Sequence, residues 1–182
     1  VVSAVDIKAD YHIEGNKVVV EINFKEARGL EFRLPFDAVA VEANTLDYVI
    51  SEEKNYKILK VEKADNLTIK YVSGYYIEKS SKRTFFVLKN EFSENASVKV
   101  FLPEGSVLSD AEKPFVMPLP SDMDTDGRRL IIIWNNFGGE SILIGYEFVE
   151  TAEVLFWVLI GVVLVGFVIF YAYNWAKARK LF

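Results

Sequence analysis

The chain has 182 residues, a length that allows one domain or two small ones. It holds 21 basic and 26 acidic residues, and all the acidic ones lie at or before Glu153, so nucleic-acid binding by that acidic part is disfavoured because phosphate would be repelled. Cysteine is absent and His12 is the single histidine, which argues against disulfides, a zinc site and a Ser-His-Asp arrangement.

The N-terminal residues indicate the compartment of the protein, and the composition indicates the kind of organism it comes from. Val1-Val2-Ser3-Ala4 resembles the small-residue end of a secretory signal peptide or the residues just after its cleavage site, the alternative being an arbitrary boundary. Glutamine is absent, while lysine and glutamate are abundant. This composition is typical of hyperthermophiles, and an archaeal source would fit it.

Short strands separated by turns are expected through residue 150. Val18, Val20 and Ile22 alternate with polar or outward positions, the period of a half-buried strand. The expected strands are Val5–Ile13, Lys17–Phe24, Leu30–Leu34, Ala38–Glu42, Asp47–Ser51, Tyr56–Val61, Leu67–Val72, Tyr75–Glu78, Arg83–Leu88, Ala96–Leu102, Arg128–Trp134 and Ser141–Phe148. About a dozen short strands predict an all-β fold, with residues 1–150 forming a β-sandwich domain.

The expected core follows the apolar face of these strands. Its members are Val20, Ile22, Phe24, Phe32, Leu34, Ile58, Val61, Ile69, Tyr71, Phe86, Leu88, Val98, Val100, Leu102, Ile131, Ile133, Ile142 and Ile144. Ser109–Asp126 holds three prolines and is predicted to be a surface loop.

An acidic motif follows this loop. Asp122, Asp124 and Asp126 precede Gly127 in a D-x-D-x-D-G pattern, the first half of a calcium loop. Ile133 stands where such a loop needs a bidentate glutamate, so calcium would need an acid from elsewhere. The alternative is an acidic approach to a turn at Asp126-Gly127. No other cofactor is indicated.

Two N-glycosylation acceptors occur in the same part of the chain. They are Asn66, in Asn66-Leu67-Thr68, and Asn95, in Asn95-Ala96-Ser97. If this part lies outside the cytoplasm, either asparagine could carry a glycan.

An uncharged run, Val154–Tyr173, predicts one transmembrane helix within residues 151–176. Its 20 residues would span roughly 30 Å as a helix, the thickness of the hydrocarbon layer. Aromatic residues stand near its ends, and the basic tail of residues 177–182 is expected in the cytoplasm by the positive-inside rule. Gly161 and Gly166 are five apart and do not form a GxxxG pattern. The residues expected to anchor the helix are Trp157, Gly161, Gly166, Trp175, Lys177, Arg179 and Lys180.

Two stretches support the same architecture through a resemblance. Phe101-Leu102-Pro103-Glu104-Gly105 and Asp126–Trp134, followed by the closing strand that leads into the helix, resemble the outer domains of archaeal single-span membrane proteins. The resemblance implies a β-rich outer domain and one membrane helix. In many such chains a cytoplasmic winged-helix domain follows, and the sequence holds none after its basic tail.

These observations predict a single-pass protein of the cell membrane, with its N-terminal domain outside and its C-terminus in the cytoplasm. No nucleophile pairs with a base in any recognisable motif, so a non-enzymatic role is expected and no catalytic residue is assigned. The expected partners are membrane lipid and other membrane-protein subunits, bound through the outer domain. The alternative is the outer domain of a membrane-bound sensor or transcription regulator whose output domain lies elsewhere.

Overall fold

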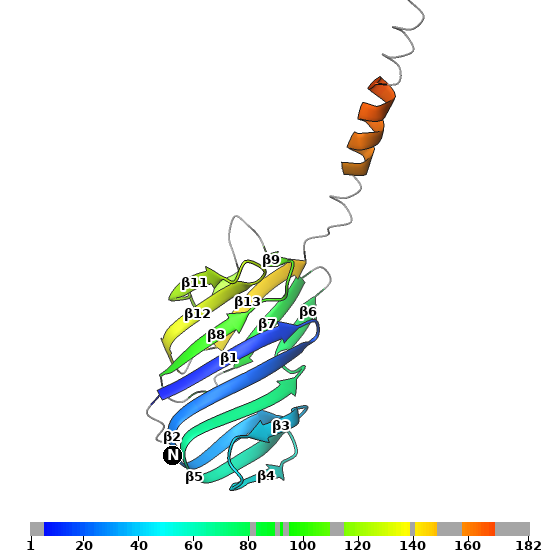
Figure 1. Cartoon of the computed structure of the whole chain (residues 1–182). Coiled ribbons are helices and arrows are strands. Elements are labelled where there is room, and N and C mark those ends of the chain that lie inside the picture. Colours follow the sequence, from blue (N-terminus) through cyan, green and yellow to red (C-terminus); the bar gives the residue numbers. More distant parts are fainter. Residues whose placement is uncertain are drawn as a thin grey trace, which may run out of the picture. The chain divides into compact units, whose positions relative to one another are not determined.

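The computed structural model of the chain describes residues 6–80, 83–89, 92, 95–109, 115–138, 141–148 and 158–169. The chain divides into two compact units, Val1–Phe148 and Val149–Phe182. The described part of the first unit consists of β-strands and the turns that join them (Figure 1). The all-β prediction is therefore confirmed for this unit.

Eight strands form the larger of two sheets. Their order is β11-β12-β8-β1-β2-β5-β3, and β4 also pairs with β5. All neighbours are antiparallel except β1 and β8, which run parallel. The strands are β1 (Asp6–Glu14), β2 (Lys17–Pro35), β3 (Val39–Ala43), β4 (Tyr48–Glu52), β5 (Tyr56–Ser73), β8 (Ala96–Phe101), β11 (Asp122–Thr125) and β12 (Leu130–Phe137).

Five strands form the smaller sheet. Their order is β10-β13-β7-β6, and β9 also pairs with β13. The strands are β6 (Ile77–Ser80), β7 (Arg83–Lys89), β9 (Ser106–Leu108), β10 (Val116–Met117) and β13 (Ser141–Phe148).

The apolar period of two decides which face of each strand is buried. Val18, Val20 and Ile22 of β2 are fully buried, as are their cross-strand neighbours on β1 and β5. Burying one such aliphatic side chain contributes roughly 1.5–3 kcal/mol. Glu14 pairs with Lys17, so β1 and β2 form a hairpin through the two-residue turn at Gly15 and Asn16.

The two sheets meet through aromatic side chains. The ring of Tyr11 on β1 lies 5.5 Å from the rings of both Tyr76 and Phe86, in edge-to-face contacts. The hydroxyls of Tyr71 on β5 and Tyr76 are 2.6 Å apart and share a hydrogen bond inside the core. Burial of these polar groups is therefore compensated, and the aromatic contacts join the larger sheet to the smaller one.

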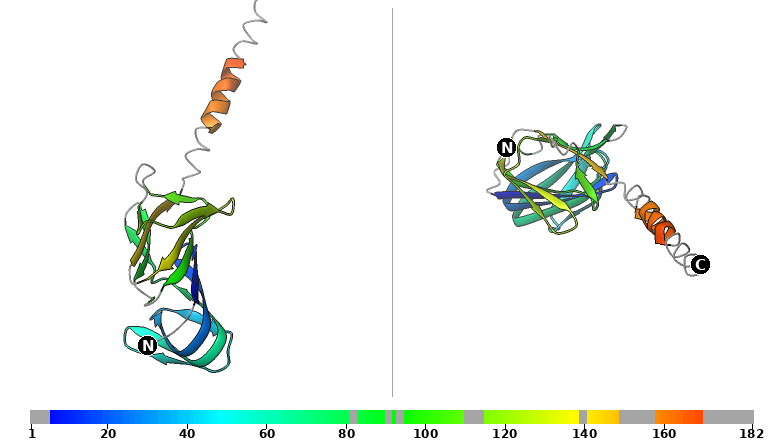
Figure 2. Two further views of the ribbon diagram at one scale, coloured as in Figure 1. Left: turned by 90° about the vertical axis from the view of Figure 1, so that its left-hand side faces the viewer. Right: turned by 90° about the horizontal axis from the view of Figure 1, so that it is seen from above.

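The two longest strands, β2 and β5, form a ribbon that bends back on itself. They pair along their whole length, with Pro35 opposite Tyr56 at one end. Val39, four residues after Pro35, pairs with Val72 at the other end of β5. Four residues reach about 14 Å, whereas a straight strand of this length would measure about 55 Å, so the ends of the ribbon must come together. Figure 2 shows the resulting roll in the lower part of its left view.

The bend coincides with two residues in the left-handed backbone region. Gly29 has φ of 58° and Glu26 has φ of 63°. Glycine adopts this conformation without strain, whereas glutamate adopts it at a cost. The buried residues change phase here, from Phe24 to Ala27 to Leu30.

Asp37 closes the roll. Its carboxylate accepts hydrogen bonds from the hydroxyl of Ser73 at 2.6 Å and from the backbone N–H of Gly74 at 2.8 Å. From the opposite end of β5, the amine of Lys57 donates to the carbonyl of Ala38 at 2.9 Å. The loop between β2 and β3 thus ties both ends of β5 together.

Several predicted strand boundaries were wrong. Lys17–Phe24 and Leu30–Leu34 belong to one strand, because the glycine between them bends β2 without ending it. Tyr56–Val61 and Leu67–Val72 likewise form one strand, because the polar stretch between them stays paired with β2. The predicted loop Ser109–Asp126 contains β10 and β11. These strands of two and four residues are too short to show a period in the sequence.

The predicted core was right except at three positions. Ile58, Ile131 and Ile133 are only partly buried, while Leu59, Ile132 and Trp134 point into the core. Leu130–Ile133 is apolar at every position, so periodicity could not decide which face points inward.

The second unit contributes one helix to the described residues, spanning 158–169. It lies inside the predicted transmembrane segment 151–176 and includes Gly161 and Gly166. An added Cβ on either glycine would meet nothing within 4 Å. Within the part of the chain that the structure describes, no helix is long and apolar enough to cross a membrane. The other predicted anchor residues, Trp157, Trp175, Lys177, Arg179 and Lys180, lie outside the described residues.

Candidate interaction surface

The outward face of the eight-stranded sheet carries a row of charges across four strands. Lys70, Glu21, Asp10 and Lys99 stand opposite one another in that order. The amine of Lys70 lies 2.8 Å from the carboxylate of Glu21. This hydrogen bond lowers the pKa of Glu21 and raises the pKa of Lys70. Exposed pairs of this kind add little net stability, so the row mainly keeps the face hydrated.

Asp10 is the member of the row with an unfavourable environment. Burial raises the pKa of its carboxyl group, against the attraction of Lys99. The charged form therefore costs stability above the raised pKa, and this cost vanishes once the pH falls below the ordinary value of 3.8.

We expect Asp10→Asn to raise the melting temperature at pH 7 by about 1–3 °C, because the amide removes the buried charge. The difference from the parent protein should shrink as the pH falls toward 3.8. Thermal melts from pH 7 to pH 3 test this, with exposed Glu14→Gln as the control. A lower melting temperature at pH 7 would show that attraction by Lys99 outweighs burial.

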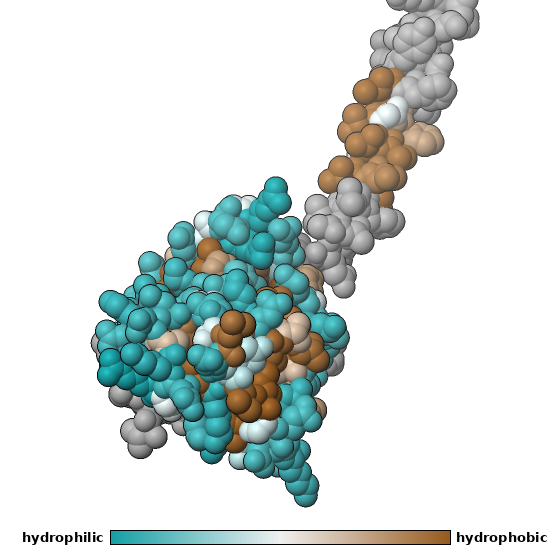
Figure 3. Space-filling model, turned by 60° about the horizontal axis from the view of Figure 1, so that its bottom comes forward, coloured by the Kyte–Doolittle hydropathy of each residue, from teal (hydrophilic) through white to brown (hydrophobic). Residues whose placement is uncertain are grey.

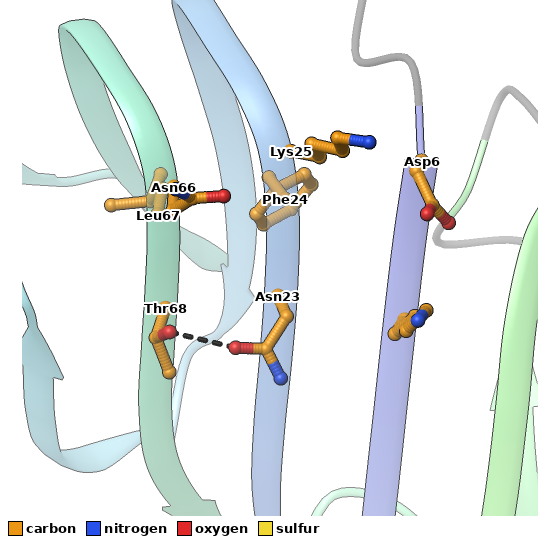
Figure 4. A pocket seen from close by; sticks show the side chains of 8 residues that line it. Asp6, Asn23, Phe24, Lys25, Asn66, Leu67 and Thr68 are labelled. Carbon is orange, nitrogen blue, oxygen red and sulfur yellow. Dashed lines mark hydrogen bonds between the residues drawn. The ribbon is translucent and has the colours of Figure 1, made fainter.

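A hollow of about 190 Å³ lies on the same sheet face (Figure 4). Inside it, the hydroxyl of Thr68 donates to the side-chain oxygen of Asn23 at 2.7 Å. The backbone N–H of Thr68 donates to the side chain of Asn44 at 2.8 Å. Thr68 thus hydrogen-bonds to two asparagine side chains, while the charged groups of Asp6, Lys8 and Lys25 also line the hollow. The residues that line the hollow are Asp6, Lys8, Asn23, Phe24, Lys25, Asn66, Leu67 and Thr68.

The predicted glycosylation acceptors are both exposed. Asn66 lies in β5 at the rim of this hollow, and its carbonyl accepts a hydrogen bond from Asn44 at 3.0 Å. Asn95 lies directly before β8. Whether either carries a glycan stays a prediction.

The acidic motif lies on an outer strand of the eight-stranded sheet. The carboxylates of Asp122 and Asp124 accept hydrogen bonds from the backbone N–H of the next residue, at 2.8 and 2.7 Å. Asp126 instead organises the turn, since it accepts from the N–H groups of Arg128 and Arg129, which lower its pKa. Among the described residues, no three His, Cys, Asp or Glu side chains gather where they could hold a metal ion.

Asp122 and Asp124 thus accept hydrogen bonds from backbone N–H groups of β11, which is an edge strand of the larger sheet. An incoming strand would need such donors, so the two carboxylates protect this edge from pairing with another chain.

We expect Asp122→Ala combined with Asp124→Ala to promote self-association, because it frees two edge donors and removes two charges. Light scattering against protein concentration measures this. Glu62→Ala combined with Asp65→Ala, which removes two charges from β5, serves as the control. Equal scattering by both double variants would show that the edge geometry is irrelevant.

Exposed apolar side chains gather on residues 36–50, around β3 and β4. Leu46 and Val49 are 99% and 66% exposed. Figure 3, which brings the lower part of Figure 1 forward, shows hydrophobic surface grouped amid hydrophilic surface. We call this surface the β3–β4 patch. Its members are Phe36, Val39, Leu46, Val49 and Ile50.

The β3–β4 patch also borders an unpaired sheet edge. Among the described strands, β3 and β4 pair only with β5, so their other edge has no partner. Unlike β11, neither strand has carboxylates hydrogen-bonded to its own backbone amides in the described structure. An apolar edge strand without such protection is a surface on which a partner can add a strand or pack side chains.

Sequence reasoning missed this patch. Valine and isoleucine in two short strands are typical of ordinary sheet positions, and only the pairing with β5 reveals that Val49 points away from the core. The exposed turn residue Leu46, between Thr45 and Asp47, was the one available signal. Comparison with known proteins gives no further guide, since no protein-family model and no curated protein matches the chain.

Proposed function

We propose that the chain is a single-pass, membrane-anchored binding subunit. Its β-domain lies outside the cytoplasm and docks onto other membrane-protein subunits through the β3–β4 patch. The exposed apolar side chains beside an unpaired edge are the observation that carries this proposal, because clustered apolar side chains on a domain surface typically mark an interaction site.

The membrane anchor in this proposal is supported by the sequence. Val154–Tyr173 has the length and apolarity of a membrane span, and Lys177, Arg179 and Lys180 follow it as a cytoplasmic flank should. Alkaline carbonate extraction of native membranes tests the anchor. The full chain should stay in the membrane pellet, and release into the supernatant would contradict the proposal.

We expect Val49→Lys to abolish association with partner subunits while changing the free energy of unfolding by less than about 0.5 kcal/mol, since the side chain is exposed. The full chain is purified from native membranes in mild detergent, and the mass of the resulting complex is measured. Asn16→Lys adds the same charge at the exposed β1–β2 turn and should leave the complex intact. A parent chain that always runs alone would overturn the proposed function.

A further inference from the structure

The smaller sheet carries apolar side chains on both faces, and among the described residues charged side chains lie only at the margins of the outward face. Glu78 stands opposite Phe85 and Glu147 opposite Val107, and the amine of Lys89 lies 3.7 Å from the carboxylate of Glu78. Ile142 and Ile144 of β13 point into the core, as do Phe86 and Leu88 of β7. Phe85 and Val87 of β7 and Leu143 of β13 alternate with these residues and point to the outward face. Apolar side chains at these positions are unusual for an antiparallel sheet with one solvated face. We call this outward surface the back face. Its members are Phe85, Val87, Val107, Phe115, Met117 and Leu143.

The pairing register makes the back face continuous. Met117, Leu143 and Val87 lie opposite one another across β10, β13 and β7. The rings of Phe85 and Phe115 are 5.9 Å apart in an edge-to-face contact. Met117 is 58% exposed and Val107 is 44% exposed, so the face is open to a binding partner.

Gly145 leaves space for Phe85 and Phe115 to pack over the middle of the back face. A Cβ at this position would lie 3.2 Å from the ring of Phe85 and 3.3 Å from Phe115. Both separations are tighter than ordinary van der Waals contact. The missing side chain at position 145 thus leaves room for both phenylalanines to pack against β13.

The sequence that follows β13 indicates what covers this face. Phe148, the last residue of β13, precedes the apolar run that begins at Val154 by six residues. Six residues reach at most about 22 Å. If the run is inserted in a bilayer, the end of β13 is therefore held within that distance of the lipid. The larger sheet differs, because the charged row crosses the middle of its outward face, whereas Glu78, Lys89 and Glu147 stand at the margins of the back face.

We infer that the back face rests on the lipid surface, an inference that depends on the membrane anchor of the proposed function. Aromatic, methionine and aliphatic side chains of this kind favour the boundary between headgroups and acyl chains. The contact leaves the β3–β4 patch to bind protein.

Site-directed spin labelling tests the inference, and the absence of native cysteine makes single-label variants straightforward. The full chain is reconstituted, one copy per disc, in phosphatidylcholine nanodiscs. Met117→Cys and Val107→Cys report on the back face, Leu46→Cys on the β3–β4 patch and Gly161→Cys on the anchor. Accessibility to oxygen, which concentrates in lipid, is compared with accessibility to a water-soluble nickel chelate.

The inference expects the oxygen-to-nickel ratio at positions 107 and 117 to exceed the ratio at Leu46 severalfold. A lipid-like ratio at Gly161 with water-like ratios at 107 and 117 would overturn the inference and leave the anchor standing. A water-like ratio at Gly161 would overturn the anchor and the inference together. Protection of 107 and 117 from both reagents would assign the back face to a protein contact and overturn the lipid contact.

Discussion

Phe86→Ala should lower the free energy of unfolding of the β-domain by about 3–5 kcal/mol, the range for removing a fully buried aromatic side chain. Phe86 is completely buried, and its ring contacts Tyr11 of the larger sheet and Tyr76 of the turn between β5 and β6. The substitution leaves a cavity where the two sheets meet, so neither sheet can close it alone. Equilibrium unfolding in guanidinium, followed by tryptophan fluorescence, measures the loss.

Two further variants make this prediction specific. Phe86→Leu keeps most of the volume and should cost less than about 1.5 kcal/mol. Phe36→Ala removes the same ring from an exposed site, 59% accessible, and should change stability by less than about 0.5 kcal/mol. A similar loss for Phe86→Ala and Phe36→Ala would contradict the packing described for the core.

Asp37→Ala should cost about 1–3 kcal/mol, because it removes the acceptor that joins the β2–β3 loop to the end of β5. The hydroxyl of Ser73 and the backbone N–H of Gly74 would both lose their partner. Chemical denaturation measures the cost, and hydrogen exchange should report faster opening of β3 than of β1.

A double-mutant cycle separates this bridge from general damage. Ser73→Ala alone removes one of the two donors, and combined with Asp37→Ala it should cost less than the sum of the two single changes. Additive costs would show that Asp37 stabilises the loop by other contacts. Exposed Asp47→Ala provides a matched control within the next loop.

The fold class was predictable because strand periodicity is strong in this sequence. Val18, Val20 and Ile22 alternate without interruption, so β2 and its buried face could be recognised from sequence alone. The roll could not, because it depends on the pairing of Val39 with Val72 across 33 positions of the chain. Local sequence at Gly29 indicates a break, and only the paired neighbour shows that the strand continues through it.

The candidate surfaces were harder to predict for a related reason. Whether an apolar residue is core or surface depends on which side of the sheet faces the partner sheet. In β7 the run Phe85-Phe86-Val87-Leu88 is apolar throughout, a pattern typical of strands covered on both faces. Such a run is a signal for an apolar outward face, which was not predicted, whereas the β3–β4 patch required knowledge of the free edge.

The parallel pair of β1 and β8 constrains how the domain is assembled. Ile7 pairs with Ala96, so β1 can form this pairing only after β8, almost ninety positions later in the chain, has been synthesised. The hairpin of β1 and β2 and the long ribbon with β5 need only sequence already synthesised by Ser73. Contacts so distant in sequence slow folding, because a long loop must close before they form. During synthesis, the N-terminal half can thus be ordered while the edge of β1 that later pairs with β8 stays unpaired, and β8, β12 and β11 then extend the larger sheet from that edge.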